Sequence, residues 1–515
     1  MSRLDEPICI VGVATHTVRD RDAPEPLDLW ADAIRAAAHD AGNPALLRDV
    51  DSLTTTYCQT WQYDDPTARL ADELGIEPRH RHYQPIGGTS GQQLVDLAAR
   101  RIRAGESDIV AIASAEALAT QAASRKRGEQ REYRFKPETK RPFPFEAPLH
   151  PQETAADLLS ALNAFALFDS ARRAHRGVAL DDHRRALAEM FAPMSEVAAR
   201  NPDAWFPTAR TADAIVEARP DNRMTAYPYT KYMVAVMDVD MAAAVVVMSE
   251  SAANRLAIDR DRRVYLRGSA YLTDPVYVAQ HRELHHSPAM RRAAQFALNT
   301  AGVHLDDVAL LDIYSCFGSS LFFACDALGI APDDSRGLTV TGGLPYHGGP
   351  GSGYMVHSIA AITRRLREAR GSALVSGVGM INTKHTFGVY SCDPPNRTVE
   401  PPPAAIDLAA EQTRLDDENG PIDIVDDYTG EATILALTVV HGRDGAARHG
   451  IAVVELDAEQ AGSASTPRRA YARFLDPDML VAAEQRELVG ARAHLVPHPF
   501  TGVMGEQSGH LARLV

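Results

Sequence analysis

The chain has 515 residues, 45% of them hydrophobic, which is enough material for about two to four separate cores. Its formal net charge of −15 at pH 7 argues against a nucleic-acid partner, because an acidic surface repels a polyanion. An anionic ligand would therefore need a local basic patch.

The cysteines and the apolar segments indicate a protein of a reducing compartment. The five cysteines form no CxxC pair, so neither a disulfide framework nor a zinc site is expected. The N-terminal residues lack the pattern of a signal peptide. The longest apolar stretch, residues 233–248, contains two aspartates and is shorter than a membrane helix. We therefore expect a cytoplasmic location, no metal and no membrane contact.

The first 116 residues alternate between strand and helix signals. Strands are predicted at 8–14, 52–57 and 108–115, and helices at 27–41, 66–74 and 90–104. This alternation is typical of an α/β fold whose parallel sheet is covered by helices. From 117 to 225 the sequence becomes helical and polar, which indicates an inserted subdomain.

A second series of strands and helices follows the insertion. Its strands are predicted near 263–271, at 308–314 and at 373–377, and its helices at 288–301 and 353–370. Two series of similar size predict a duplicated fold. The first half comprises 1–116 and 226–262, and the second half comprises 263–400.

A proline-rich tract at 394–405 has the composition of an extended linker. Beyond it, the segments 431–440 and 451–456 predict a hairpin. Two further strands, at 470–474 and 491–496, flank a short helix. We therefore expect residues 401–515 to form a small, OB-like β-barrel.

Four segments at predicted strand ends carry polar groups. The first, GGTSGQQL at 87–94, starts a helix, so a ligand beside Gly88 and Ser90 would face unpaired N–H groups and the positive helix end. The alternative is a glycine turn that merely caps the helix. The second, LDIYSCFGSS at 311–320, presents Tyr314 and Cys316 where parallel sheets hold ligands. Cys316 could equally be a small buried apolar residue.

The third segment, TVTGGLPYHGGPGSGYMVHS at 339–358, is rich in glycine, so its backbone can approach a ligand closely. It contains Gly348 and Gly349, and His347 could serve as an acid or base near neutral pH. The fourth, SGVGMINTKHTFGVYS at 376–391, presents Lys384 and His385. Each histidine could also be a structural hydrogen-bonding group.

The entry to the insertion is strongly basic between 124 and 141. Arg125 and Arg127 in this stretch could bind the phosphates of a nucleotide-bearing substrate. A run of charge can also be no more than a solvated face.

These strings together resemble the thiolase superfamily over nearly the whole chain. SGQQLVDLAARRIRAGESDIVAIASAEAL is similar to the segment that follows the thiolase nucleophile, TVTGGLPYHGGPGSG to the segment with the GHP motif, and DIYSCF to the HDCF segment. With TKHTFGVYS and the appended β-domain, they resemble the thiolase-like proteins of type 1, often labelled acetyl-CoA acetyltransferases. The resemblance implies a five-layered αβαβα fold. It also implies an acyl-CoA thioester as substrate or ligand, no permanently bound cofactor, and a homodimer or a protein partner at the C-terminal domain.

The catalytic positions of the family are all changed. Gly88 stands where the nucleophilic cysteine should be, and Gly349 stands at the GHP histidine. Tyr314 replaces the HDCF histidine, and Val375 stands at the second cysteine. An acyl-enzyme at Gly88 is thereby excluded, because glycine has no thiol.

The sequence leaves several functions open. The chain could be an enzyme that acts on acyl thioesters through Tyr314, Cys316, His347 and His385. It could be a noncatalytic acyl-CoA-binding or scaffold protein. It could also be a cysteine-independent C–C lyase of the aldolase type that uses Tyr314, or Cys316 could be a relocated nucleophile.

Overall fold

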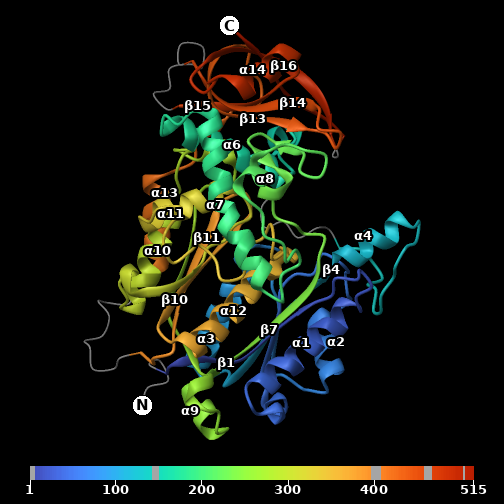
Figure 1. The fold of residues 1–515 in the computed structure, drawn as a ribbon, viewed down its shortest axis with the longest axis vertical. Coiled ribbons are helices and arrows are strands. Elements are labelled where there is room, and N and C mark those ends of the chain that lie inside the picture. The colour runs from blue at the N-terminus through green and yellow to red at the C-terminus, as the bar shows by residue number, and fades with distance from the viewer. Residues whose placement is uncertain (1–5, 142–149, 396–406, 458–466, 503–504) are drawn as a thin grey trace.

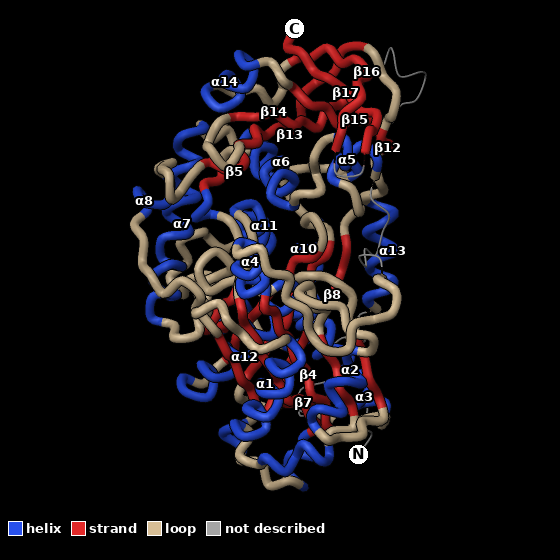
Figure 2. The backbone as a smooth tube through the Cα atoms, turned by 90° about the vertical axis from the view of Figure 1, so that its right-hand side faces the viewer, coloured by secondary structure: helices blue, strands red, loops and turns tan. Residues whose placement is uncertain are grey.

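The computed structural model describes residues 6–141, 150–395, 407–457, 467–502 and 505–515. An α/β body carries a β-barrel at the end that holds the C-terminus (Figure 1). Figure 2 shows the barrel strands gathered at that end, with α6 of the insertion beneath them.

One mixed sheet of nine strands forms the centre of the body, in the order β3-β2-β4-β7-β1-β8-β11-β10-β9. Its first-half strands are β1 (Ile8–Thr17), β2 (Ser52–Thr55), β3 (His80–Tyr83), β4 (Ile109–Ala117) and β7 (Asp240–Ser249). Its second-half strands are β8 (Val264–Thr273), β9 (Val308–Asp312), β10 (Ser372–Gly379) and β11 (Lys384–Ser391). The central strands are almost continuously apolar because helices cover both faces.

The body has five layers, as the resemblance predicts. Helices α1 (Pro26–Asp40) and α2 (Pro66–Leu74) cover the outer face of the first half, together with the short α9 (Glu250–Arg255). Helices α3 (Ser90–Ala104) and α12 (Tyr354–Ala369) contact strands of both halves and form the middle layer. Helices α10 (Pro288–Ala301) and α11 (Gly318–Leu328) cover the second half, with α13 (Leu408–Glu418) beside them.

The two halves repeat one pairing pattern, which confirms the predicted duplication. β1, β7 and β4 pair antiparallel in turn, and β4 pairs parallel with β2. β8, β11 and β10 do the same, and β10 pairs parallel with β9. Gly12 and Gly268 occupy matching places: a Cβ at either would run into a helix carbonyl, that of Ala37 or Ala297. Close strand-to-helix packing therefore requires glycine at both positions.

The insertion is mainly helical. It contains α4 (Leu118–Lys126), α5 (Pro151–Ala155), α6 (Ala161–His175), α7 (Leu180–Arg200) and α8 (Ala212–Val216), followed by the short strands β5 (Met224–Ala226) and β6 (Tyr229–Thr230). β5 pairs with β13 of the barrel rather than with the body sheet.

The predicted small barrel is present as five strands that close in a ring. The strands are β13 (Gly430–His441), β14 (Ala447–Leu456), β15 (Arg468–Phe474), β17 (Gly505–Leu514) and β16 (Arg492–Gly502), and β16 pairs back to β13. The two-residue strand β12 (Asp423–Ile424) and the helix α14 (Pro477–Gln485) flank this ring. Closure leaves no free edge between these five strands.

Buried polar contacts attach the barrel to the body. Tyr471 donates to Glu153 of α5 at 2.6 Å. Arg469, which is 5% exposed, donates to the carbonyl oxygens of Ala279 and Arg282, the first at 3.2 Å and the second at 2.9 Å, and also to that of His281. A buried guanidinium with carbonyl acceptors satisfies groups that would otherwise be costly to bury.

Two sequence interpretations differ from the structure or lie outside it. Residues 384–391 form strand β11 rather than a loop, because β10 turns back at 380–383 and pairs with them over eight residues. The predicted linker at 394–405 lies, except for its first two residues, outside the described residues. No helix in the described part of the chain is both long enough and apolar enough to cross a membrane.

Arg469→Met should loosen the barrel. The substitution roughly keeps the volume but leaves two buried carbonyl groups and one partly buried carbonyl group without this donor, so we expect a loss of about 3 kcal/mol in the free energy of unfolding. Urea titration would measure the loss, with Arg448→Met, at a half-exposed barrel arginine paired to Asp444, as the control. Equal stability of both variants would contradict this account of docking.

Candidate active site between the two halves

The N-terminus of α3 lies against strand β10 and Tyr314 without room for a side chain between them. A Cβ added at Gly88 would collide with the carbonyl oxygen of Val378 and with the hydroxyl of Tyr314, and would lie 2.7 Å from Tyr314 Cζ. The space in which a nucleophile on residue 88 would sit is therefore filled by the phenol. Glycine is required here because of close packing.

Tyr314 follows the end of β9 and is fixed through its backbone. Its N–H donates to Ser376 Oγ at 2.9 Å, and its carbonyl accepts from Ser320 Oγ at 3.0 Å. Its ring meets Tyr354 edge-on with centroids 5.4 Å apart. Burial raises the pKa of Tyr314, and nearby Cys316 adds to the effect. Tyr314 is thus a neutral phenol at physiological pH, able to donate a proton or a hydrogen bond.

The buried carboxylate of Asp312 organises the glycine-rich loop. Its Oδ1 accepts from the Thr339 hydroxyl at 2.7 Å, from the Val340 N–H at 2.9 Å, and from both the N–H and the hydroxyl of Thr341. Its Oδ2 accepts from the Tyr354 hydroxyl at 3.2 Å. Such a set of donors offsets the cost of burying the charge. Asp312 therefore positions both the loop and the ring that supports Tyr314.

His347 lies in a second network behind Tyr354. It is 1% exposed, with Nδ1 3.4 Å from Asn201 Nδ2 and Nε2 3.4 Å from Nδ1 of His357 on α12. Its ring centroid is 6.0 Å from that of Tyr354. Burial lowers the pKa of His347 to about 4, so the imidazole is neutral at pH 7.

The structure places His385 in a different network. Its Nε2 lies 3.0 Å from Oδ2 of Asp274, and both side chains are buried. The same carboxylate accepts from Ser287 and from the N–H of Ala289, at the start of α10. Although burial alone would raise the pKa of Asp274, His385 holds it below its usual value. His385 therefore organises a helix start and is not brought together with His347.

Cys316 has the properties of a structural thiol. It is 8% exposed, and burial raises its pKa to about 12. A thiol with that pKa supplies almost no thiolate at neutral pH and is a poor nucleophile.

Three of the predicted ligand-binding residues serve the local backbone. The hydroxyl of Ser90 donates to the carbonyl of Gly87 at 2.7 Å, within its own turn. Gly348 has φ +107°, and a Cβ there would meet Met241 Sδ at 2.9 Å. Gly349 donates its N–H to the carbonyl of Val236 at 2.8 Å. These contacts shape the loop that forms one wall of the site.

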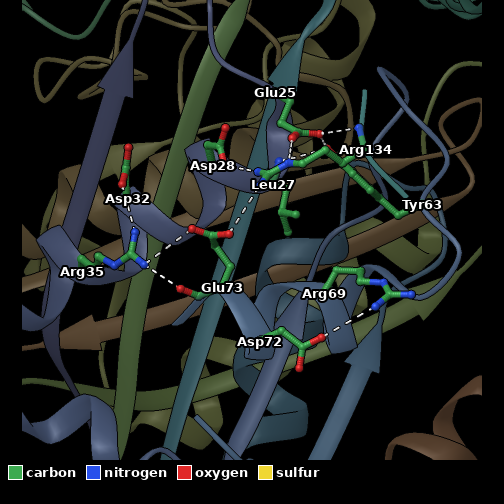
Figure 3. Close-up of polar contacts among 10 residues, drawn as sticks. All are labelled: Glu25, Leu27, Asp28, Asp32, Arg35, Tyr63, Arg69, Asp72, Glu73 and Arg134. Carbon is green, nitrogen blue, oxygen red and sulfur yellow. Dashed lines mark hydrogen bonds and ion pairs between the residues drawn. The ribbon is translucent and has the colours of Figure 1, made fainter. Parts of the chain in front are cut away.

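Half of the eight basic side chains in the entry form ion pairs with nearby acids. Arg134 forms ion pairs with Glu25 and Asp28 near the start of α1, and its Nη1 lies 3.6 Å from Glu73 of α2 (Figure 3). Arg127 pairs with Glu129 at 2.8 Å. The ion pairs of Arg134 attach part of the basic entry to the first half of the body.

Arg125, in contrast, lines a cleft of about 770 Å³. Arg131, Lys136, Lys140 and the aromatic ring of Trp61 line it too. The cleft reaches toward the site: Gln59 on its wall approaches Gly351, and the next residue, Ser352, accepts from the N–H of Gly87 at 3.0 Å. Arg127 does not line this cleft.

Sequence reasoning missed the residues that support Tyr314 from behind. Asp312, Tyr354 and His357 are all buried and polar, and each lies within or beside a segment that the sequence singles out. Asp312 immediately precedes Ile313 and Tyr314 in a buried strand signal. An aspartate inside a buried strand signal predicts that hydrogen-bond donors surround its carboxylate.

Among solved structures, the chain is similar to a monomeric SCP2-thiolase-like protein type 1 from Mycobacterium smegmatis. The two are 30% identical over 100% of both chains, with a TM-score of 0.82. The chain is also similar to the Ltp2-ChsH2(DUF35) aldolase, at 18% identity over 75% of this chain and 98% of that one, with a TM-score of 0.58. It is similar as well to human mitochondrial 3-ketoacyl-CoA thiolase, at 17% identity over 75% of this chain and 99% of that one, with a TM-score of 0.53. No protein-family model and no curated protein matches the chain.

Restoring a cysteine at position 88 should not restore a thiolase. Gly88→Cys would force its Cβ into the Val378 carbonyl and the Tyr314 ring, so we expect a loss of about 2–4 kcal/mol in the free energy of unfolding. Gly87→Ala is the matched control, since its Cβ would meet no atom closer than 3.7 Å. A Gly88→Cys variant as stable as Gly87→Ala would show that the site has room for a nucleophile.

Acid should destabilise the protein partly through His347. Its pKa is about 4 when folded and about 6.5 when unfolded, so the unfolded chain binds more protons between these values and stability falls as the pH drops below 6.5. At pH 5 this histidine should account for about 2 kcal/mol.

Urea unfolding at pH 7 and pH 5 would measure this loss, which should be smaller in His347→Gln than in the natural protein. His304→Gln, at an exposed histidine, is the control. If His347→Gln loses as much stability as the natural protein, the imidazole is not buried in the neutral form.

Proposed function

The chain belongs to the SCP2-thiolase-like proteins of type 1, and we propose that it binds acyl thioesters of the coenzyme A type without forming an acyl-cysteine. The observation that supports this proposal most directly is the filled space beside Gly88, where Tyr314 and the Val378 carbonyl leave no room for a thiol. Cys316 does not replace the missing group, because its pKa of about 12 keeps it protonated.

The cleft lined by Arg125 is the proposed place for the nucleotide end of the thioester. Arg125 and Lys140 on its wall suit phosphate groups, whereas Arg131 and Lys136 are paired with Asp22 and Glu132. Trp61 offers an aromatic face to a base. The thioester end would then lie along Gln59 and Gly351 toward Gly88. Arg127 plays no direct part in this arrangement because it is paired with Glu129 and lies off the cleft.

The polar group best placed for chemistry is the phenol of Tyr314, which favours a C–C lyase of the aldolase type. When the Cα–Cβ bond of a β-hydroxyacyl thioester breaks, the hydroxyl proton leaves to water, a carbonyl product departs, and an enolate of the shortened thioester remains. A neutral phenol at the start of α3 can stabilise that enolate and protonate its α-carbon, after which the phenolate regains a proton from water. The structural likeness to a protein described as an aldolase agrees with this reaction class.

The noncatalytic alternative also has an observation in its favour. His347 and His385 are held by internal contacts with His357 and Asp274, so neither is free to serve as a base. A chain that binds acyl thioesters and converts none of them would fit this arrangement.

Tyr314→Phe should separate binding from chemistry. The substitution removes only the hydroxyl, so we expect the affinity for an acyl-CoA panel to change less than about threefold and lyase turnover to fall by about 10²–10⁴. Calorimetry would measure binding, and product analysis by mass spectrometry would measure turnover. Tyr428→Phe, whose hydroxyl donates within the barrel to Glu431, is the control.

The outcomes separate the alternatives. Binding without turnover in the natural protein would favour the noncatalytic function, and an acyl adduct on any cysteine in intact-mass spectra would refute the cysteine-independent chemistry. Absence of binding to every acyl-CoA tested would refute the proposal as a whole.

A further inference from the structure

A second cleft, of about 840 Å³, lies on the second half, away from Gly88 and Tyr314. It is lined from α6 of the insertion, from α11 with the turn after it, and from the segment that leads into α10. α6, α11 and α10 follow one another below the barrel in Figures 1 and 2. Its volume is within the usual range of small-molecule sites. We call it the histidine cleft.

Guanidinium groups outnumber carboxylates in the lining of the histidine cleft. Arg172 binds Asp326 through two hydrogen bonds, of 2.7 and 3.1 Å, and its guanidinium lies 4.3 Å from the ring centroid of Phe322. Arg176 reaches the same carboxylate at 2.6 Å and is 51% exposed. One carboxylate thus serves two guanidinium groups, and a positive charge remains uncompensated.

Arg291, on α10, adds a further charge from another side of the histidine cleft. It is exposed and has no ion-pair partner among the residues that the structure describes. On a chain with a net charge of −15, a cleft with three guanidinium groups and one lining carboxylate is a local exception. Its field attracts a small anion.

Three imidazoles line the same histidine cleft. His175 and His285 stack with centroids 3.6 Å apart and planes 10° apart, and His286 lies 4.8 Å from His285. Burial and the two neighbouring histidines lower the pKa of His285 to about 4, so the inner ring of the stack is neutral at pH 7. Because Nδ1 of His285 faces Oε2 of Glu283 at 3.4 Å, the N–H available to an anion comes from His175 or His286.

These imidazoles do not indicate a metal site. Within the described ranges, no group of three histidine, cysteine or acidic side chains is placed to hold a metal ion. A guanidinium group has only hydrogen-bond donors, and a neutral imidazole has one donor and one acceptor. Together they suit an anion with several acceptor oxygens.

We propose that the histidine cleft binds a phosphate group, at a site separate from the thioester site. Arg176 and Arg291 approach it from the insertion and from the second half, so a phosphate held by both would connect these two parts of the body. Arg172 would remain paired to Asp326 and hold Arg176 in place through the shared carboxylate. The free phosphate ion and a small organic phosphate share the tetrahedral oxygen group that these donors fit.

Histidine footprinting with diethyl pyrocarbonate, read by peptide mass spectrometry, tests the site directly. Millimolar inorganic phosphate should protect His175 from carbethoxylation and leave the exposed His304 unprotected. Arg176→Ala combined with Arg291→Ala should weaken the protection about tenfold or more, as read from the phosphate concentration at half protection. Arg365→Ala, at an exposed arginine of α12, is the matched control.

Two ligands distinguish the sources of the phosphate. Stronger protection by adenosine 3′,5′-bisphosphate than by inorganic phosphate would identify an organic phosphate as the ligand, and the reverse would identify the free ion. No protection of His175 by either, or protection that survives the double substitution, would overturn the proposal. Protection of His175 by acyl-CoA, with acyl-CoA binding impaired in the double variant, would show that the two sites are the same and would overturn their separateness. If the chain binds no acyl-CoA, the protection of His175 by phosphate should remain, so the two proposals can fail independently.

Discussion

The buried carboxylate of Asp312 is the constraint on which the candidate site depends. A charge can remain inside a protein only when donors surround it, and the donors of Asp312 come from the loop at 339–341 and from Tyr354 of α12. The carboxylate thereby fixes three elements relative to one another: the end of β9, the glycine-rich loop and the middle-layer helix. Tyr314 lies two residues after Asp312, so the contacts that fix Asp312 also fix the backbone that carries Tyr314.

The duplication explains why such a site can form at all. Helices α3 and α12 come from different halves and lie together in the middle layer, so each presents its N-terminal end to loops of both halves. Gly88 precedes α3, whereas Tyr314 and Val378 belong to the second half, and they meet where the start of this middle-layer helix packs against the second half. The same closeness that builds the site leaves no room for a side chain at position 88.

Local signals account for the elements that the sequence predicted best. The helices at 66–74, 90–104 and 288–301 agree with the structure to the residue. Each ends at a glycine in the left-handed conformation, Gly75, Gly105 or Gly302, which stops a helix for reasons present in the sequence itself. Strand β11 was missed because its strand character comes from pairing with β10 and β8 and not from its own composition.

The site could be predicted only in part, for a related reason. The sequence identified Tyr314, His347 and His385 from their predicted places at strand and loop ends, although His385 lies within strand β11 and not in a loop. It could not tell which polar groups share a network, because their partners Tyr354, Asn201 and Asp274 are set by tertiary packing. The pairing of Asp274 with His385 spans 111 positions in the chain, beyond any local pattern.

The loss of the thiolase groups changes what the remaining framework can do. An acyl-cysteine needs a thiolate with space around it, and this chain fills that space with a phenol whose pKa burial raises. Because its pKa is raised, Tyr314 is almost never present at neutral pH as the phenolate that could act as a base, and it remains protonated as a hydrogen-bond donor. Reactions that develop negative charge on a carbonyl oxygen or an α-carbon gain from a fixed donor, whereas acyl transfer to the protein also needs a nucleophile, which position 88 does not supply. Gly88 leaves empty the volume that a side chain at position 88 would need, and the ring of Tyr314 fills it. The two residues therefore form one structural change.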